Sequence, residues 1–315
     1  MITVVGFNTA MDRRIDLDVL RPGMVQRAIS VQPRPGGKGL HVAQTIAALG
    51  EPVCLVGLSD AEHDDSLRDY LRTRGVEWRP VRGAHPLRQC LAVHEADGRV
   101  TEILESGALL NPGTREALLA AAYAALGRSS AVVCTGSLPR GFAVGTYGDL
   151  AREAGKRDVR CLLDASADAL REGIRAKPWL VKPNADEAAF LLGRPVRDVQ
   201  DAVDCARLLW RQGVARAVVT LGGQGAVGFD GETLWRATCT APVDVHDSVG
   251  SGDCFLAGLA VGAVRRETLD ASLRRAVACG VANAESSETG CASPERIAAW
   301  LPHVAVDTLP VAADA

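Results

Sequence analysis

The sequence predicts an α/β fold in which helices cover both faces of a mostly parallel β-sheet, with a small second β-sheet attached. Three observations support this prediction. Short apolar strands alternate with helical patterns along most of the 315 residues, which is typical of parallel sheets. Two segments, 13–34 and 84–106, instead have the pattern of polar-faced hairpins. The glycine-rich turn Gly250-Ser-Gly252 leads into an apolar helix, and helix N-termini of this kind commonly bind anions.

The N-terminal part begins with an apolar strand, Ile2–Phe7, followed by the polar segment Asn8–Asp12. Ligands collect at such carboxyl ends of strands in open α/β folds. The turn Gly36–Gly39 opens an alanine-rich helix over 40–49. The other expected elements, in chain order, are a strand at 53–56, a helix after Ala61, a helix over 113–126, a strand at 131–134, a helix over 143–155, a strand at 160–163, a short strand before Lys182, helices to 192 and over 198–212, strands at 217–221, 225–229 and 233–236, and helices over 252–264 and 269–286.

This pattern predicts one core domain and one small accessory sheet. The core is expected to comprise residues 1–12, 35–83 and 107–315, and its last segment to end in a loose tail from residue 303. The segments 13–34 and 84–106 are expected to form a β-sheet lid over the site.

The composition excludes several classes of protein. The formal net charge is −3, which argues against nucleic acid or an anionic membrane as a partner. No apolar run is long enough to cross a membrane, and Met1 leads into a strand without a basic segment. The nine cysteines include no C-x-x-C and the six histidines show no metal-ligand spacing. We therefore expect a reduced, cytoplasmic protein without structural zinc.

The segment from Asp247 to Leu259 carries the clearest chemistry. Gly250 and Gly252 bracket Ser251, and Asp253 follows at once. Amides at a helix N-terminus can hold a phosphoryl group while a carboxylate takes the proton of an attacking hydroxyl. The alternative is an ordinary first helical turn with a stabilising acid. Neither a Walker A loop nor a dinucleotide-binding fingerprint is present, since Phe255 stands where the latter requires Gly or Ala.

Five motifs in order resemble the PfkB, or ribokinase-like, family of carbohydrate kinases along nearly the whole chain. They are Gly36–Gly50, Gly136–Pro139, Lys182–Glu187, Thr220–Gly225 and Asp247–Asp253. The N-terminal segments are most similar to the phosphosugar branch, which includes 1-phosphofructokinase, the minor 6-phosphofructokinase and tagatose-6-phosphate kinase. The resemblance implies a ribokinase-like fold, ATP and Mg²⁺ as cofactors, and transfer of phosphate to a sugar or a sugar phosphate.

For phosphoryl transfer, the resemblance implies that Asp253 is the catalytic base and that Gly250, Ser251 and Gly252 form the anion hole. Glu187 would act on Mg²⁺ through water, although an acid in the first turn after an Asn184 cap is also common. The residues implied in nucleotide binding are Lys182, Asn184, Glu187, Thr220, Gly222, Gly225, Ser248 and Asn283.

For the acceptor, the resemblance implies that Asp12 grips sugar hydroxyls while Gly36 and Gly37 allow close backbone approach. His41 stands at an acceptor-binding position, and Ser137 would donate a hydroxyl. Three cations, Lys38, Arg27 and Arg88, would bind the acceptor's phosphate, although each arginine could equally be a solvated surface residue.

The departures from the phosphosugar branch lie mainly around the acceptor. His41 replaces an asparagine, and Thr9, Gln26 and Cys90 also differ from the pattern. Asp247 replaces a second asparagine; ribokinase-like members carry aspartate there near a monovalent cation, so the resemblance implies a candidate K⁺ site. An added carboxylate near a phosphorylated substrate is unfavourable unless a cation offsets it.

We therefore expect ATP-dependent phosphorylation of a sugar phosphate. A kinase for an unphosphorylated sugar or a nucleoside is the alternative that Asp247 and His41 favour. A third hypothesis, a sugar-sensing protein without turnover, is opposed by the intact Asp253 with its flanking glycines. Exposed edges of the lid sheet, together with the resemblance, lead us to expect a homodimer through the lid.

Overall fold

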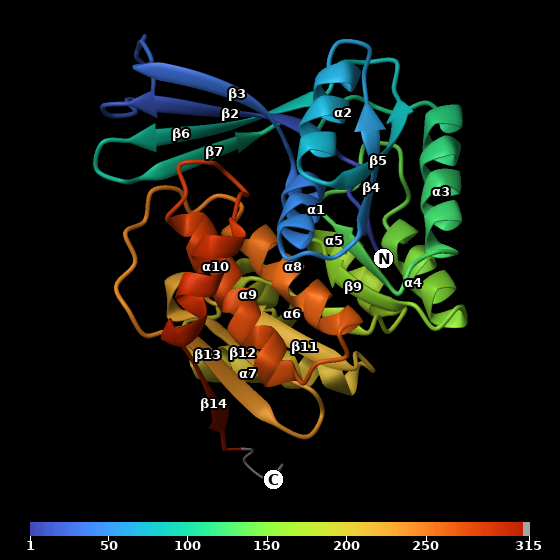
Figure 1. Ribbon diagram of the computed structural model, residues 1–315, viewed down its shortest axis with the longest axis vertical. Coiled ribbons are helices and arrows are strands. Elements are labelled where there is room, and N and C mark those ends of the chain that lie inside the picture. The colour runs from blue at the N-terminus through green and yellow to red at the C-terminus, as the bar shows by residue number, and fades with distance from the viewer. Residues whose placement is uncertain (311–315) are drawn as a thin grey trace.

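A ten-stranded β-sheet forms the centre of the computed structural model, which describes residues 1–310 (Figure 1). The strand order is β14-β13-β12-β11-β10-β9-β8-β1-β4-β5. Strands from β5 to β11 are parallel, and β12, β13 and β14 extend the sheet in antiparallel fashion. The bounds are β1 Ile2–Val5, β4 Val53–Ser59, β5 Val76–Arg82, β8 Ala131–Thr135, β9 Arg160–Asp164, β10 Leu180–Val181, β11 Arg216–Thr220, β12 Ala226–Phe229, β13 Leu234–Cys239 and β14 Val304–Leu309.

Helices cover both faces of this sheet, so the predicted mostly parallel α/β architecture is confirmed (Figure 1). α1, α8 and α9 pack against one another on one face, while α7 packs on β11 and β12. The helices are α1 Lys38–Ala48, α2 Asp64–Thr73, α3 Pro112–Leu126, α4 Thr146–Lys156, α5 Ala167–Ile174, α6 Ala185–Leu192, α7 Val199–Arg211, α8 Ser251–Val264, α9 Leu269–Ala284 and α10 Pro294–Trp300, with short 3₁₀ turns at Gly222–Gln224 and Leu301–His303.

Glycines bring the site-bearing elements close together. A Cβ on Gly6 would lie 2.6 Å from the Gly39 Cα, so β1 and α1 can touch only without side chains there. A Cβ on Gly258 would lie 2.7 Å from the Ala276 Cα, which sets the close approach of α8 and α9. α8 is buried from Asp253 to Ala263, because its sequence is apolar on all sides. These contacts fix the N-termini of α1 and α8 beside each other.

A separate four-stranded sheet, in the order β3-β2-β6-β7, projects from this body (Figure 1, upper left). Its strands are β2 Ala10–Leu17, β3 Ser30–Gly36, β6 Arg88–Glu95 and β7 Val100–Leu104. The second sheet was predicted. Its strands extend beyond the expected segment 13–34 at both ends, so Asp12 lies on β2 itself.

Three further elements differ from the sequence prediction. Residues 304–309 form β14, which pairs with β13, so the expected loose tail is wrong there; residues 311–315 lie outside the described part. β5 and the short helices α5 and α10 were not predicted.

Within residues 1–310, no helix is both long and apolar enough to cross a membrane. The nine cysteines are free thiols.

Candidate active site

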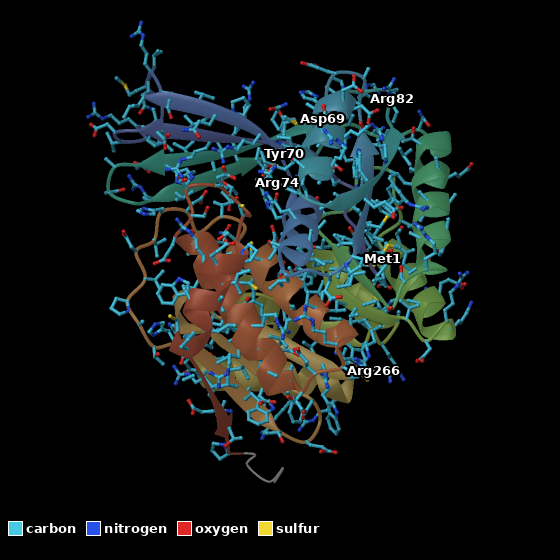
Figure 2. All side chains as sticks on the ribbon, viewed as in Figure 1. Met1, Asp69, Tyr70, Arg74, Arg82 and Arg266 are labelled. Atoms are coloured by element: carbon cyan, nitrogen blue, oxygen red, sulfur yellow. The ribbon has the colours of Figure 1, made fainter. Side chains whose placement is uncertain are left out.

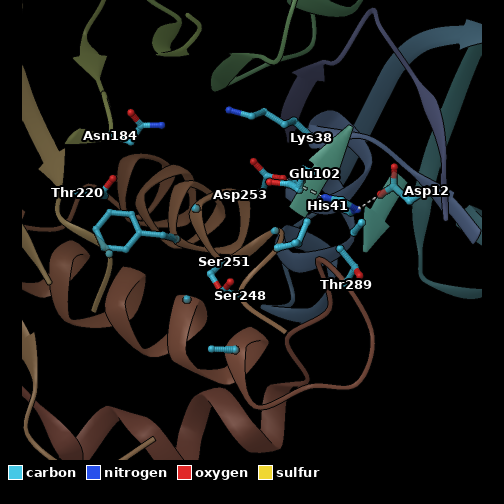
Figure 3. Close-up of a pocket in the computed structure, with 18 of the residues that line it drawn as sticks. Asp12, Lys38, His41, Glu102, Asn184, Thr220, Ser248, Ser251, Asp253 and Thr289 are labelled. Atoms are coloured by element: carbon cyan, nitrogen blue, oxygen red, sulfur yellow. Dashed lines mark hydrogen bonds and ion pairs between the residues drawn. The ribbon is translucent and has the colours of Figure 1, made fainter. Parts of the chain in front are cut away.

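The N-terminus of α8 opens into a cleft of about 600 Å³ between the main sheet and the small sheet (Figure 3). Gly250 caps the helix with a left-handed φ of 81°, and a Cβ there would lie 2.6 Å from the Gly290 backbone. Only glycine meets both requirements. The turn therefore has the backbone geometry that the sequence predicted for an anion site.

Two amides of this turn are left for a ligand. The amides of Ser251 and Asp253 donate to the carbonyls of Ser248 and Gly250, at 3.2 and 3.0 Å. The amides of Gly250 and Gly252 donate to no backbone oxygen in the described chain. Of the three amides in the predicted Gly250-Ser251-Gly252 set, only two are therefore unpaired, because the Ser251 N–H is already used within the turn.

Asp253 lies one turn into α8 and lines the cleft, with 6 % of its surface exposed. Its Oδ2 lies 3.0 Å from Nδ1 of His41, on α1. The other ring nitrogen, Nε2, lies 3.0 Å from Oδ2 of Asp12 on β2. Figure 3 shows the imidazole spanning the two carboxylates. Burial alone would lower the pKa of His41, but the hydrogen bonds to both carboxylates outweigh it and raise the pKa to about 10. His41 is therefore an imidazolium at neutral pH.

Asp12 is held from two sides. The Gly37 amide donates to its Oδ2 at 3.3 Å, and a Cβ on Gly36 would lie 2.1 Å from the Asp12 Cγ. Gly36 therefore makes room for the carboxylate instead of lining the cleft. Burial would raise the pKa of Asp12, but the hydrogen bond and charge of His41, the Gly37 amide and the charge of Arg88 lower it. The carboxylate stays ionised and faces the acceptor side of the cleft.

A buried carboxylate, Asp164 at the end of β9, holds two lysines on the third side. Lys182 Nζ lies 3.3 Å from Asp164 Oδ1, and Lys38 Nζ lies 3.5 Å from Oδ2. The charge of Asp164 is the main cause of the raised pKa of Lys38. Both ammonium groups line the cleft, so they can meet phosphate oxygens entering beside the α8 turn.

The far end of the cleft has a backbone turn and an apolar wall. An isolated β-bridge joins Asn184 to Thr220, and both line the cleft with Gly222 and Gly225. A Cβ on Gly225 would lie 2.0 Å from the Ala237 carbonyl oxygen. The apolar side chains of this part are Cys239, Val243, Val245, Phe255, Val277 and Val281. An apolar wall next to a glycine-containing backbone turn is suited to binding a nucleotide base.

Asn184 and Glu187 form a reciprocal capping box at the start of α6. Glu187 does not line the cleft itself. Its pKa is raised, first by burial and then by the charge of Asp164. Among the described residues, no group of three His, Cys, Asp or Glu side chains is placed to hold a metal ion. An ion bound here would keep water and phosphate oxygens as ligands, as Mg²⁺ does.

Six predicted site residues do not line this cleft: Gly36 and Glu187, described above, Asp247, described below, and Arg27, Ser137 and Asn283. Arg27 is exposed on the loop between β2 and β3. Ser137 accepts a hydrogen bond from Asn8 Nδ2 at 2.9 Å and is absent from the lining. Asn283 is fully buried, and its amide donates to the Val249 carbonyl and to Ser251 Oγ, both at 2.9 Å. The buried Asn283 side chain is therefore not placed for the nucleotide contact that the resemblance implied; it braces the loop before α8.

Asp247 is buried among donors. Thr289 Oγ1 donates to Oδ2 at 2.6 Å, and the Val249 amide donates to Oδ1 at 2.9 Å. Arg14 Nη1 and His94 Nε2, both on the small sheet, lie 3.8 Å from the two oxygens. The carboxylate thus faces two hydrogen-bond donors, the cation Arg14 and an imidazole whose pKa burial lowers, in contrast to the cation ligand that the sequence suggested. Ser248, by comparison, lines the cleft as predicted.

The sequence reasoning missed Asp164, Arg14 and Glu102, all of which line the cleft. Asp164 ends a buried parallel strand, a position where polar side chains often serve a ligand, so it could have been found. Arg14 and Glu102 lie on β2 and β7 and are directed inward by strand alternation. Partial desolvation and the charges of Asp253 and Asp12 raise the pKa of Glu102.

These features define a phosphotransferase that acts on a hydroxyl: a helix N-terminus with free amides, a buried carboxylate beside it, and two lysines across the cleft. Residues 1–296 match the pfkB family of carbohydrate kinases, and the chain belongs to this family. It is 30 % identical to 1-phosphofructokinase of Escherichia coli (strain K12), over 96 % of this chain and 97 % of that protein. It is 28 % identical to tagatose-6-phosphate kinase of Staphylococcus epidermidis, over 92 % of this chain and 94 % of that protein.

Solved structures agree with this assignment. Phosphofructokinase-2 from Escherichia coli in complex with potassium superposes with a TM-score of 0.86, at 27 % identity, covering 96 % of this chain and 98 % of the other. The tetrameric inhibited form of the same enzyme gives a TM-score of 0.85 with the same identity and coverage. The predicted ribokinase-like fold and the predicted carbohydrate kinase class are confirmed.

Proposed function

We propose that this kinase transfers the γ-phosphoryl group of ATP to a hydroxyl of a sugar phosphate. One observation carries the proposal: the Asp253 carboxylate and the free amides of Gly250 and Gly252 open into one cleft that Asp12 enters from the opposite side. A general base, an anion hole and a hydroxyl-binding carboxylate are the three parts that the reaction needs.

In the proposed reaction, Asp253 takes the proton of the acceptor hydroxyl as its oxygen attacks the γ-phosphorus. The bond to the β–γ bridging oxygen breaks, and ADP leaves with that electron pair. The Gly250 and Gly252 amides stabilise the charge on the transferred group. Lys182 and Lys38 bind phosphate oxygens, and the backbone near Thr220 binds the nucleotide.

The residues fit a Mg²⁺ ion held mainly through water. Asp164 Oδ1 is buried with the Lys182 ammonium at 3.3 Å, and Glu187 lies near enough for the Asp164 charge to affect its pKa. These two carboxylates would hold the ion's water ligands, and the ion would neutralise phosphate charge. Chelation by EDTA should abolish turnover.

The charges favour a phosphorylated acceptor. Arg88 lines the cleft and is anchored by donation to the carbonyls of Asn8 and Glu105, both at 3.1 Å. The cation Arg14 offsets Asp247, while burial lowers the pKa of His94 and leaves its imidazole neutral. The extra carboxylate that favoured a free sugar or a nucleoside is therefore compensated within the protein. The relatives named above act on phosphorylated sugars, as their names state.

An acceptor panel tests the proposal. ADP formation should be measured with fructose-6-phosphate, fructose-1-phosphate, tagatose-6-phosphate, free hexoses, ribose and nucleosides. We expect a sugar phosphate to give the highest kcat/KM. A higher kcat/KM for a free sugar or a nucleoside would contradict the assignment, and no stimulation of ADP formation by any acceptor would favour a sensor.

The donors around Asp247 favour activity without K⁺, so rates in potassium and tetramethylammonium salts should agree.

We further propose a homodimer through the small sheet. Among the described residues, six of the eleven exposed large hydrophobic side chains belong to its edge strands β3 and β7 or to the β2–β3 loop: Met24, Val25, Ile29, Val31, Ile103 and Leu104. Exposed apolar side chains on the edges of an open sheet favour association. Light scattering should give twice the monomer mass of 33.1 kDa, and Val31→Lys should lower it. The nine free thiols support a cytoplasmic location.

A further inference from the structure

The acceptor side of the cleft contains a side chain that the proposed chemistry does not yet use. His41 stands where the family pattern has a neutral asparagine, and it contacts the proposed base and the proposed acceptor-binding carboxylate at once. We propose that His41 is a positioning residue: its ring forms a strut that bridges Asp12 and Asp253 and sets the spacing and orientation of the two carboxylates.

The geometry of the strut supports this role. Each ring nitrogen lies 3.0 Å from one carboxylate oxygen, so the ring needs both N–H groups to donate in both directions. A neutral imidazole carries only one N–H and would leave one contact without a proton. The raised pKa of His41 agrees with the doubly protonated form. The strut joins β2, α1 and α8, which otherwise come from different parts of the chain.

The ring position is built into the backbone. A Cβ on Gly290 would lie 2.2 Å from ring atoms Cγ and Cδ2 of His41. The Gly290 carbonyl accepts a hydrogen bond from Gln44 on α1, whose Oε1 accepts from Tyr70 on α2 at 3.2 Å. Figure 2 places Tyr70 and Arg74 together near the junction with the small sheet, and the Arg74 guanidinium lies 3.6 Å from the Tyr70 ring centre. These contacts hold the loop that leaves space for the imidazole.

The surrounding charges allow a permanent cation at this position. Asp12 on β2 and Asp253 on α8 contact the ring, and Glu102 on β7 faces the same cleft. The other charged groups of this region are Arg14 on β2, Arg88 on β6, Lys38 on α1 and Asp247 before α8. A neutral residue at position 41 would leave Asp12 and Asp253 without their nearest counter-charge. Because the two like charges would then repel each other, removal of the imidazolium should disturb the spacing of the two carboxylates.

The first experiment measures this effect through the proposed kinase activity, and so rests on the proposed function. His41→Asn restores the family's neutral residue, and His85→Asn makes the same change at an exposed position. We expect His41→Asn to lower kcat and to raise the KM for the acceptor about 10-fold, because Asp12 and Asp253 lose their common hydrogen-bond donor, while the KM for ATP stays within about threefold. His85→Asn should match the parent protein in all three constants. Unchanged kcat and acceptor KM in His41→Asn, or an equal change in His85→Asn, would contradict the positioning role.

Two further measurements remain informative if activity or folding is lost. In ¹⁵N-histidine NMR spectra of the unmodified protein, His41 should keep both ring nitrogens protonated from pH 6 to 9, which needs no acceptor; a neutral tautomer at pH 7.5 would overturn the proposal. Gly290→Ala should lower the melting temperature more in the parent than in a His41→Ala background, since the contacts with Cγ and Cδ2 at 2.2 Å are then absent. Equal losses in the two backgrounds would show that the ring does not require Gly290.

Discussion

Asp164→Asn tests how the cleft keeps two lysines charged beside each other. The Asp164 side chain is 1 % exposed and that of Lys182 is 4 % exposed, with 3.3 Å between Oδ1 and Nζ. At that distance two charges attract by about 5 kcal/mol for an effective dielectric of about 20. Desolvation of the two groups cancels part of this attraction. Lys38, with 41 % of its side chain exposed, contributes little to stability because solvent screens its charge.

The main cost of the substitution is the unpaired Lys182. Removing one partner of a buried ion pair costs about 3–5 kcal/mol. For a chain of this length that corresponds to a melting temperature lower by about 6–10 °C, at about 2 °C per kcal/mol. Burial would raise the pKa of Asp164, but Lys182 and Lys38 lower it. Its stabilising effect is therefore present above about pH 4 and is lost as the pH falls further.

Urea unfolding and thermal scans in EDTA at pH 7.5 provide the assay. The matched control is Asp149→Asn, which removes an exposed pair with Arg152 and should cost less than about 1 kcal/mol. ATP added in EDTA should stabilise Asp164→Asn more than the parent protein, because its phosphates replace the lost negative charge. If Asp164→Asn unfolds within about 0.5 kcal/mol of the parent protein, the two lysines do not depend on Asp164 and the reasoning is refuted.

Three other predictions concern the nucleotide turn, the strut and the acceptor's phosphate. Gly225→Ala would place a methyl group 2.0 Å from the Ala237 carbonyl oxygen at a φ of 88°. We expect it to lower the free energy of unfolding by about 2–4 kcal/mol and to raise the KM for ATP. The control Gly223→Ala, at a position with open space around it, should change neither quantity. Because the pKa of His41 is raised to about 10, its stabilising effect is complete below about pH 6.5 and is lost as the pH rises through about 10. The unfolding free energies of the parent and His41→Asn, measured in urea, should therefore converge between pH 6.5 and 10; a constant difference would contradict an imidazolium. Arg88→Ala should raise the KM for the phosphorylated acceptor about 10- to 100-fold, the loss of one charge-assisted contact, and change the KM for ATP little; an equal effect on a free sugar would assign Arg88 to the fold alone.

The sequence predicted the parts of the site that are local in the chain. The Gly36–Gly39 and Gly250–Asp253 turns have short-range glycine patterns with a direct backbone meaning, and both lie where they were expected. The alternation of strands and helices likewise predicted the main sheet. The site could be assembled in advance only because these motifs resemble a known family in the same order.

Long-range contacts could not be predicted in this way. Nothing near position 41 shows that its ring would reach both Asp12 and Asp253, since the three residues come from β2, α1 and α8. The family resemblance implies a nucleotide contact for Asn283, whereas the buried side chain is turned toward the loop before α8. β14 was taken for a loose tail because its strand character depends on pairing with β13, a tertiary contact.

The most direct test of the central claim is the acceptor-dependent kcat of Asp253→Asn. If Asp253 is the base, kcat should fall by about 10²- to 10⁴-fold, while MgATP binding measured by calorimetry stays within threefold of the parent protein. Asp270→Asn, which changes the first-turn acid of the neighbouring helix α9, should keep full activity. A kcat for Asp253→Asn within threefold of the parent protein would contradict the claim.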